Sequence, residues 1–75
     1  MSSAIELIVE GYVRLNNRQA LEELRIHRER LAADLKYRQS QGDAFDYSKS
    51  ITQIEEEIAV IEAGLKKLRA ASGSA

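Results

Sequence analysis

The stretch that decides the fold is ITQIEEEIAVIEAGLKKL, residues 51–68. Its aliphatic residues recur at alternating intervals of three and four positions, which places them along one side of an α-helix. They are Ile51, Ile54, Ile58, Ile61, Leu65 and Leu68. A stripe of this kind needs to be covered by other helices, so the sequence predicts an all-α fold.

The segments on either side of the loop QSQGDAFD, residues 39–46, predict a helical hairpin. Gly42-Asp43 in this loop is typical of a turn. Helices are expected at residues 17–38 and 47–70, and the short connection requires them to run antiparallel. The apolar face of the helix at 17–38 carries Leu21, Leu24, Leu31 and Leu35.

A shorter helix is predicted ahead of the hairpin, at residues 3–15. The phase of the apolar pattern changes at Asn16-Asn17, because continuing the first stripe would place Gln19 in the core. Asparagine favours helix N-caps, and Asn16 with Gln19 has the spacing of a capping box. We therefore expect a break or sharp kink here, with a continuous bent helix as the alternative. The apolar face of this first helix holds Ile5, Ile8 and Tyr12.

The last helix has signals at both of its ends. Asp46 can cap a helix that begins at Tyr47, whereas Ser50 offers a competing capping box one turn later. Phe45 is the only phenylalanine, and we expect it to plug the end of the core beneath the loop. Residues 71–75 are expected to form a flexible tail.

Length and composition predict one small domain, residues 1–75, that needs support beyond its own core. A chain of this size buries only about 60% of its unfolded surface, which leaves a monomer marginally stable. The sequence has no cysteine and one histidine, so a disulfide or a zinc site cannot supply that support. Regular helix packing and oligomerisation are the remaining remedies. We expect no signal peptide and no contact with a membrane, and a cytoplasmic or virion location.

The titratable residues do not form a recognisable catalytic or metal-binding set. His27 lies beside the leucine seam, and its helical neighbours are Glu23 and Arg30 rather than a nucleophile. Three consecutive glutamates at residues 55–57 point about 100° apart and cannot converge on one ion. We therefore predict a protein that is not an enzyme and uses no cofactor or metal.

Three arginines are the candidates for contact with nucleic acid. Arg14, Arg18 and Arg25 fall at positions that can share a face, and such a row can bind phosphates. The formal net charge of −1 and the interleaved Glu22 and Glu23 weaken this field, and no aromatic platform accompanies it. Nucleic-acid binding is therefore the less favoured alternative.

Arg28 takes a core-type position among the leucines of residues 17–38. Its stem can pack there while the charge reaches solvent, or it can pair with a carboxylate across an interface and set the register between subunits. His27 and Arg28 interrupt the strip that should cover residues 51–68. This stripe is thus too long and too apolar for its own hairpin, which predicts contact with a second subunit or another partner.

The predicted assembly is a homo-oligomer, most simply a dimer in which two hairpins form a four-helix bundle with coiled-coil-like packing. Gly64 permits the close approach of another helix, for which residues 3–15 of the same or another subunit are the candidate. The other possible partner that we predict is a different protein. The residues expected at the interfaces are Ile5, Ile8, Tyr12, Leu21, Leu24, Leu31, Leu35, Ile51, Ile54, Ile58, Ile61, Leu65 and Leu68.

Residues 47–65, YSKSITQIEEEIAVIEAGL, resemble the last helix of the small head-to-tail joining proteins of tailed phages. The loop lacks the hairpin of alternating β-formers found in that family, and the first helix is an addition to it. The resemblance implies a role in virion assembly, with many copies arranged in a ring at the portal. The matching residues are Tyr47-Ser48, Ile51, Ile54, Ile58 and Ile61-Glu62.

In architecture alone, the hairpin is also similar to the Rop-type RNA-binding proteins, which pair two hairpins into a four-helix bundle. These features together predict that the chain is a small bacterial or phage protein that acts as a non-enzymatic assembly or adaptor module. The alternative is a small oligomeric regulator that binds RNA or DNA through the arginines named above.

Overall fold

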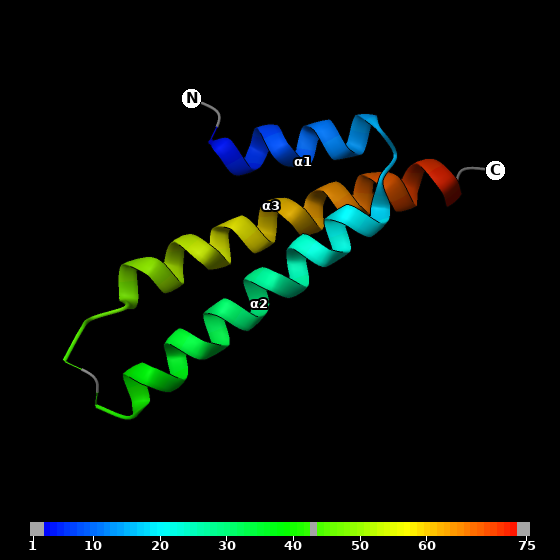
Figure 1. The fold of residues 1–75 in the computed structure, drawn as a ribbon. Helices are drawn as coiled ribbons and strands as arrows, with labels where there is room; N and C mark the ends of the chain where they lie inside the picture. The colour runs from blue at the N-terminus through cyan, green and yellow to red at the C-terminus, as the bar shows by residue number, and fades with distance from the viewer. Residues whose placement is uncertain (1–2, 43, 74–75) are drawn as a thin grey trace.

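Three helices make up most of the computed structural model, which describes residues 3–42 and 44–73. They are α1 (Ala4–Arg14), α2 (Arg18–Ser40) and α3 (Ser48–Gly73). The described residues contain no β-strand, so the predicted all-α class is confirmed. The helices α2 and α3 form an antiparallel hairpin, and α1 lies along α3 on the half of the hairpin away from the loop (Figure 1).

Helix boundaries lie close to those predicted, except at the end of α3. This helix continues to Gly73, so the prediction that a flexible tail begins at residue 71 is wrong for residues 71–73. Residues 74–75 of the expected tail lie outside the described residues.

The break between α1 and α2 is a sharp reversal made by two asparagines. Asn16 adopts a φ of 54°, in the left-handed region that asparagine tolerates better than most residues. The N–H of Asn16 donates to the carbonyl of Val13 at 3.0 Å and that of Asn17 to the carbonyl of Tyr12 at 2.9 Å, which closes α1 with a Schellman motif. Asn17 then caps α2, because its side-chain oxygen accepts the N–H of Ala20 at 3.1 Å. The predicted break is confirmed, whereas a bent continuous helix and Asn16 as the N-cap are wrong.

The loop between α2 and α3 confirms one expectation and corrects two others. Asp46 Oδ1 accepts the Ser48 hydroxyl at 2.6 Å and the Ser48 N–H at 3.0 Å, and these two hydrogen bonds lower the pKa of the Asp46 carboxyl. The Asp46 carboxylate therefore satisfies the N–H of Ser48, the first residue of α3, as expected of a residue at a helix start. The helix begins one residue after the predicted Tyr47, and the later start at Ser50 is wrong. Phe45 does not plug the core, because it is 71% exposed. Its ring centroid lies 6.3 Å from that of the half-buried Tyr47.

The core lies where all three helices meet. Leu21 of α2 and Ile61 of α3 are fully buried at its centre. Burying an aliphatic side chain of this size contributes about 1.5–3 kcal/mol, so this cluster is the main driving force for the fold. The other buried members are Ile5, Val9, Leu65 and Leu68.

The close packing of α1 on α3 depends on the glycine at position 64. A Cβ at Gly64 would lie 2.5 Å from Cγ1 of Val9 and 3.3 Å from Cγ2 of Val13. Val9 is buried, so its side chain has little room to move aside. Any side chain at position 64 would therefore separate the two helices.

Replacing Gly64 with valine is expected to push α1 away from α3 and open the core beside Val9. Overpacking a filled site of this kind lowers the free energy of unfolding by about 1–3 kcal/mol, which urea denaturation followed by circular dichroism measures. Ala63→Val is the matched control, because Ala63 is the exposed neighbour on the same helix. Equal stability of the two variants would contradict the packing of α1 described above.

Candidate interaction surface

Many residues predicted at subunit interfaces are buried inside the single chain. The helices α1 and α2 together cover the C-terminal half of the aliphatic stripe of α3. Contact of the stripe with a second subunit or another partner therefore stays a prediction only for its exposed and half-buried residues. The residues buried within the chain leave the set of interface candidates; they are Ile5 of α1, Leu21 of α2, and Ile54, Ile61, Leu65 and Leu68 of α3. Of the remaining candidates, Ile8 is 45% and Leu31 39% exposed, and the half-buried ones are Tyr12, Leu24, Leu35, Ile51 and Ile58.

The loop end of the hairpin extends beyond α1 (Figure 1). We call residues 28–40 of α2 and 48–57 of α3 the hairpin arm. The base of the arm reaches the start of α1, where Gln53, Glu56 and Glu57 line a hollow with Ser3, Ile5 and Glu6. Ala32 and Ile54 are buried between its two helices. Because two helices cannot cover an apolar seam from both sides, other aliphatic residues of the arm stay partly open to solvent. They are Leu31, Leu35 and Ile51.

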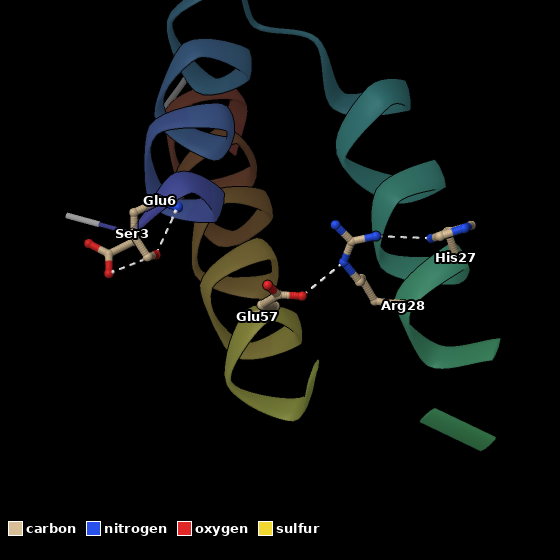
Figure 2. A network of polar contacts seen from close by, with 5 residues as sticks. All are labelled: Ser3, Glu6, His27, Arg28 and Glu57. Carbon is tan, nitrogen blue, oxygen red and sulfur yellow. Dashed lines mark hydrogen bonds and ion pairs between the residues drawn. The ribbon is translucent and has the colours of Figure 1, made fainter. Parts of the chain in front are cut away.

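Arg28 and Glu57 join the two helices at the base of the arm, as Figure 2 shows. Arg28 Nε donates to Glu57 Oε1 at 3.0 Å, and the two side chains are 23% and 21% exposed. The partner of Arg28 therefore belongs to its own chain, so the pair fixes the register of α2 on α3 and not that of two subunits. A second contact joins Arg28 Nη1 to Nδ1 of the exposed His27 at 3.0 Å. Arginine has only donors, so the His27 ring must accept through Nδ1.

The acidic run at residues 55–57 is distributed over different contacts. Glu55 Oε2 accepts from Lys36 Nζ at 2.9 Å in a pair whose side chains are more than half exposed, and Glu56 faces solvent. In the described part of the chain, no three His, Cys, Asp or Glu side chains come together where they could hold a metal ion. Across residues 3–42 and 44–73, no helix combines the length and apolar character needed to cross a membrane.

The arginines considered for nucleic-acid contact do not form one row. Arg14 lies on α1, where it pairs with Glu10 at 3.1 Å, and the chain reverses before α2 begins. Arg18 and Arg25 lie together beside a hollow of about 300 Å³ between α2 and α3. The Nε of Arg25 is buried and has no hydrogen-bond partner among the described residues. The prediction of a shared face is thus correct for two of the three arginines and wrong for Arg14.

The far side of this hollow adds two cations that reasoning from the sequence missed. Lys66 and Arg69 of α3 line it opposite Arg18 and Arg25, and we call these four residues the basic hollow. Residues at equal distances from the loop lie opposite one another in an antiparallel hairpin. This rule could have predicted from the sequence that Lys66 and Arg69 face Arg18 and Arg25. Two carboxylates, those of Glu22 and Glu62, also line the hollow, so its excess positive charge is modest.

Comparison with known proteins gives no match: no family model, no curated protein and no solved structure matches this chain. The resemblance of residues 47–65 to the phage joining proteins therefore remains a prediction.

Loss of one partner of the Arg28–Glu57 pair is expected to destabilise the hairpin. Glu57→Gln leaves the largely buried Arg28 without its counter-charge, which lowers the free energy of unfolding by about 1–2 kcal/mol, less than for a fully buried pair. Glu55→Gln is the matched control, because the Lys36–Glu55 pair is exposed and its loss costs about 0.5 kcal/mol or less. Urea denaturation of both variants measures the difference. Equal losses would show that Arg28 does not depend on Glu57.

Proposed function

We propose that the protein is a non-enzymatic assembly or adaptor module that binds a second copy of itself through the hairpin arm. The observation that carries this proposal is the arm's apolar seam, which no third helix covers and in which Leu31 is 39% exposed. Two arms packed side by side supply each other with the missing helices and form a four-helix bundle. A two-fold homodimer is the simplest product, since the same surface serves both chains.

The charges of the arm favour a second copy as its partner. Lys36 and Arg38 lie on α2, whereas Glu55 and Glu56 lie on α3. Within the chain Lys36 pairs with Glu55 and Arg38 with Asp34, and both pairs are more than half exposed, so they can exchange partners at low cost. A two-fold arrangement that sets α2 of one copy beside α3 of the other brings opposite charges together. Such rim contacts select orientation more than they add affinity.

The finer form of the proposal is a structural protein of a phage or prophage, found in the virion or in the cytoplasm before assembly. Its support is the resemblance of residues 47–65 to the joining proteins. In this form of the proposal, the hairpin arm also binds a different protein of the phage particle.

Leu31→Lys is expected to weaken self-association through the arm. The substitution removes an apolar contact and places a charge beside the same seam in each copy, so the dissociation constant rises about tenfold or more. Sedimentation equilibrium over a wide concentration range measures it. Ile26→Lys is the matched control, because Ile26 is 42% exposed on the same helix but lies outside the arm. A wild-type protein that stays monomeric, or equal effects of the two variants, would contradict the proposal.

A second candidate function is supported by the basic hollow, where we propose contact with phosphate groups of RNA or DNA. Four cations from two helices converge there, and Arg25 carries a buried Nε that lacks a partner. Binding of this kind rests on phosphate neutralisation and carries little sequence preference.

Oligonucleotide binding is then expected to weaken as salt rises. Arg25→Gln and Lys66→Gln each lower the slope of log affinity against log salt by about one, since each removes one phosphate contact. Lys49→Gln is the control, because Lys49 is exposed at the other end of α3. Fluorescence anisotropy with a labelled oligonucleotide measures the slopes. An absence of binding at low salt would exclude this candidate.

A further inference from the structure

Helix α1 is apolar on almost every side. Over residues 4–15 the charged residues are Glu6, Glu10 and Arg14, which follow one another at intervals of four and share one narrow ridge. A helix that is apolar all round is normally covered on all sides. The chain itself covers one side, where Ile5 and Val9 are buried.

The uncovered side presents a ridge of Leu7, Gly11 and Leu15, spaced by four residues. Leu7 is 60% and Leu15 74% exposed. An open depression of about 240 Å³ lies at Gly11, lined by Leu7, Glu10, Gly11 and Arg14. This outer face of α1 therefore carries two exposed leucines on either side of Gly11, and the depression lies between Leu7 and the Glu10–Arg14 ion pair.

Gly11 has neither a close packing contact nor a positive φ that would require a glycine, unlike Gly64 and Gly42. Gly64 admits the side chain of Val9, and Gly42 adopts a φ of 80°. A Cβ at Gly11 would meet no atom within 4 Å. Because glycine weakens a helix relative to alanine, position 11 would gain from a methyl group unless a second helix lies against it.

We propose that the outer face of α1 pairs antiparallel with α1 of a second copy, about a two-fold axis at Gly11. The ridge is symmetric about this glycine, so a leucine of each copy can enter the gap beside the glycine of the other. Antiparallel pairing brings Glu6 of one copy towards Arg14 of the other. It also places the two Glu10 side chains near the axis, where each pairs with Arg14 of its own chain at 3.1 Å. A second copy is thus complementary to this face in both shape and charge.

This contact is separate from the one proposed for the hairpin arm and does not rest on it. An α1 of this length spans about 16 Å, so the contact is small and weak when it acts alone. Two separate self-contacts on each chain produce assemblies larger than a dimer as concentration rises.

Gly11→Leu in the full chain separates the two roles that position 11 can have. With open space around it, the leucine favours the helix, so the variant is expected to melt at a higher temperature than wild type in dilute solution. The same side chain blocks the close approach of a second α1, so the dissociation constant of the α1 contact rises about tenfold or more. Thermal melting and sedimentation velocity on the same samples measure both changes. Ala33→Leu, at an exposed position of α2, is the matched control. Unchanged or tighter association of Gly11→Leu would overturn the proposal.

Cross-linking gives a second readout that does not depend on the fold of the Gly11 variant. The chain has no cysteine, so Leu7→Cys and Leu15→Cys introduce single thiols. Oxidation of a mixture of the two is expected to give the mixed cross-link, because antiparallel pairing sets residue 7 opposite residue 15. Cross-linking of Leu7→Cys mainly to itself, or no cross-link at high concentration, would overturn the proposal. Adding Leu31→Lys to both chains is expected to leave this cross-link in place, because Leu31 lies in the arm and not on α1. The experiment thus shows separately whether the arm contact or the α1 contact fails.

Discussion

The close packing of α1 on α3 at Gly64 is the constraint on which the rest of the structure depends. A two-helix hairpin has no enclosed interior, so the complete burial of Leu21 and Ile61 requires a third helix. Val9 of that helix reaches the interior because position 64 lacks a side chain. The reversal at Asn16-Asn17 also makes this packing possible, because it turns the chain sharply enough for α1 to lie along the hairpin.

Because α1 is shorter than the hairpin, the molecule has two unequal halves. One half has an aliphatic core shared by three helices, whereas the hairpin arm has two helices and a narrow seam. Ion pairs mark the arm, Arg28 with Glu57 at its base and Lys36 with Glu55 further out. The exposed Lys36–Glu55 pair adds little net stability, whereas the largely buried Arg28–Glu57 pair fixes the register of the two helices. The arm therefore depends on the other half for its stability, and its own apolar seam stays open to a partner.

The helices and the hairpin followed from the sequence because apolar periodicity and turn chemistry are local properties. The errors arose where one residue type suits several environments. Asn16 suits an N-cap and a left-handed helix end equally well, and the hydrophobicity of Phe45 does not show whether a loop residue reaches the seam. A stripe in the sequence shows that residues will be covered but not which chain covers them. The pairing of Arg28 with Glu57 depends on the detailed register of the two helices, which only the three-dimensional arrangement provides. The place of Lys66 in the basic hollow could have been predicted, because residues at equal distances from the loop lie opposite one another in an antiparallel hairpin.

Self-contact at α1 would link assembly to folding. The inner face of α1 completes the core through Val9, and its outer face presents Leu7 to solvent. A partner that binds the folded chain and not the unfolded one stabilises it by mass action. Pairing at the outer face would therefore hold α1 against Gly64 while it joins two copies. The stability of the core would then rise with protein concentration, although none of its residues touches the second copy. The stability of the core depends on protein concentration in this way because α1 has two apolar faces, one towards the core and one towards the second copy. The stability of a hairpin without α1 would not depend on concentration through this contact.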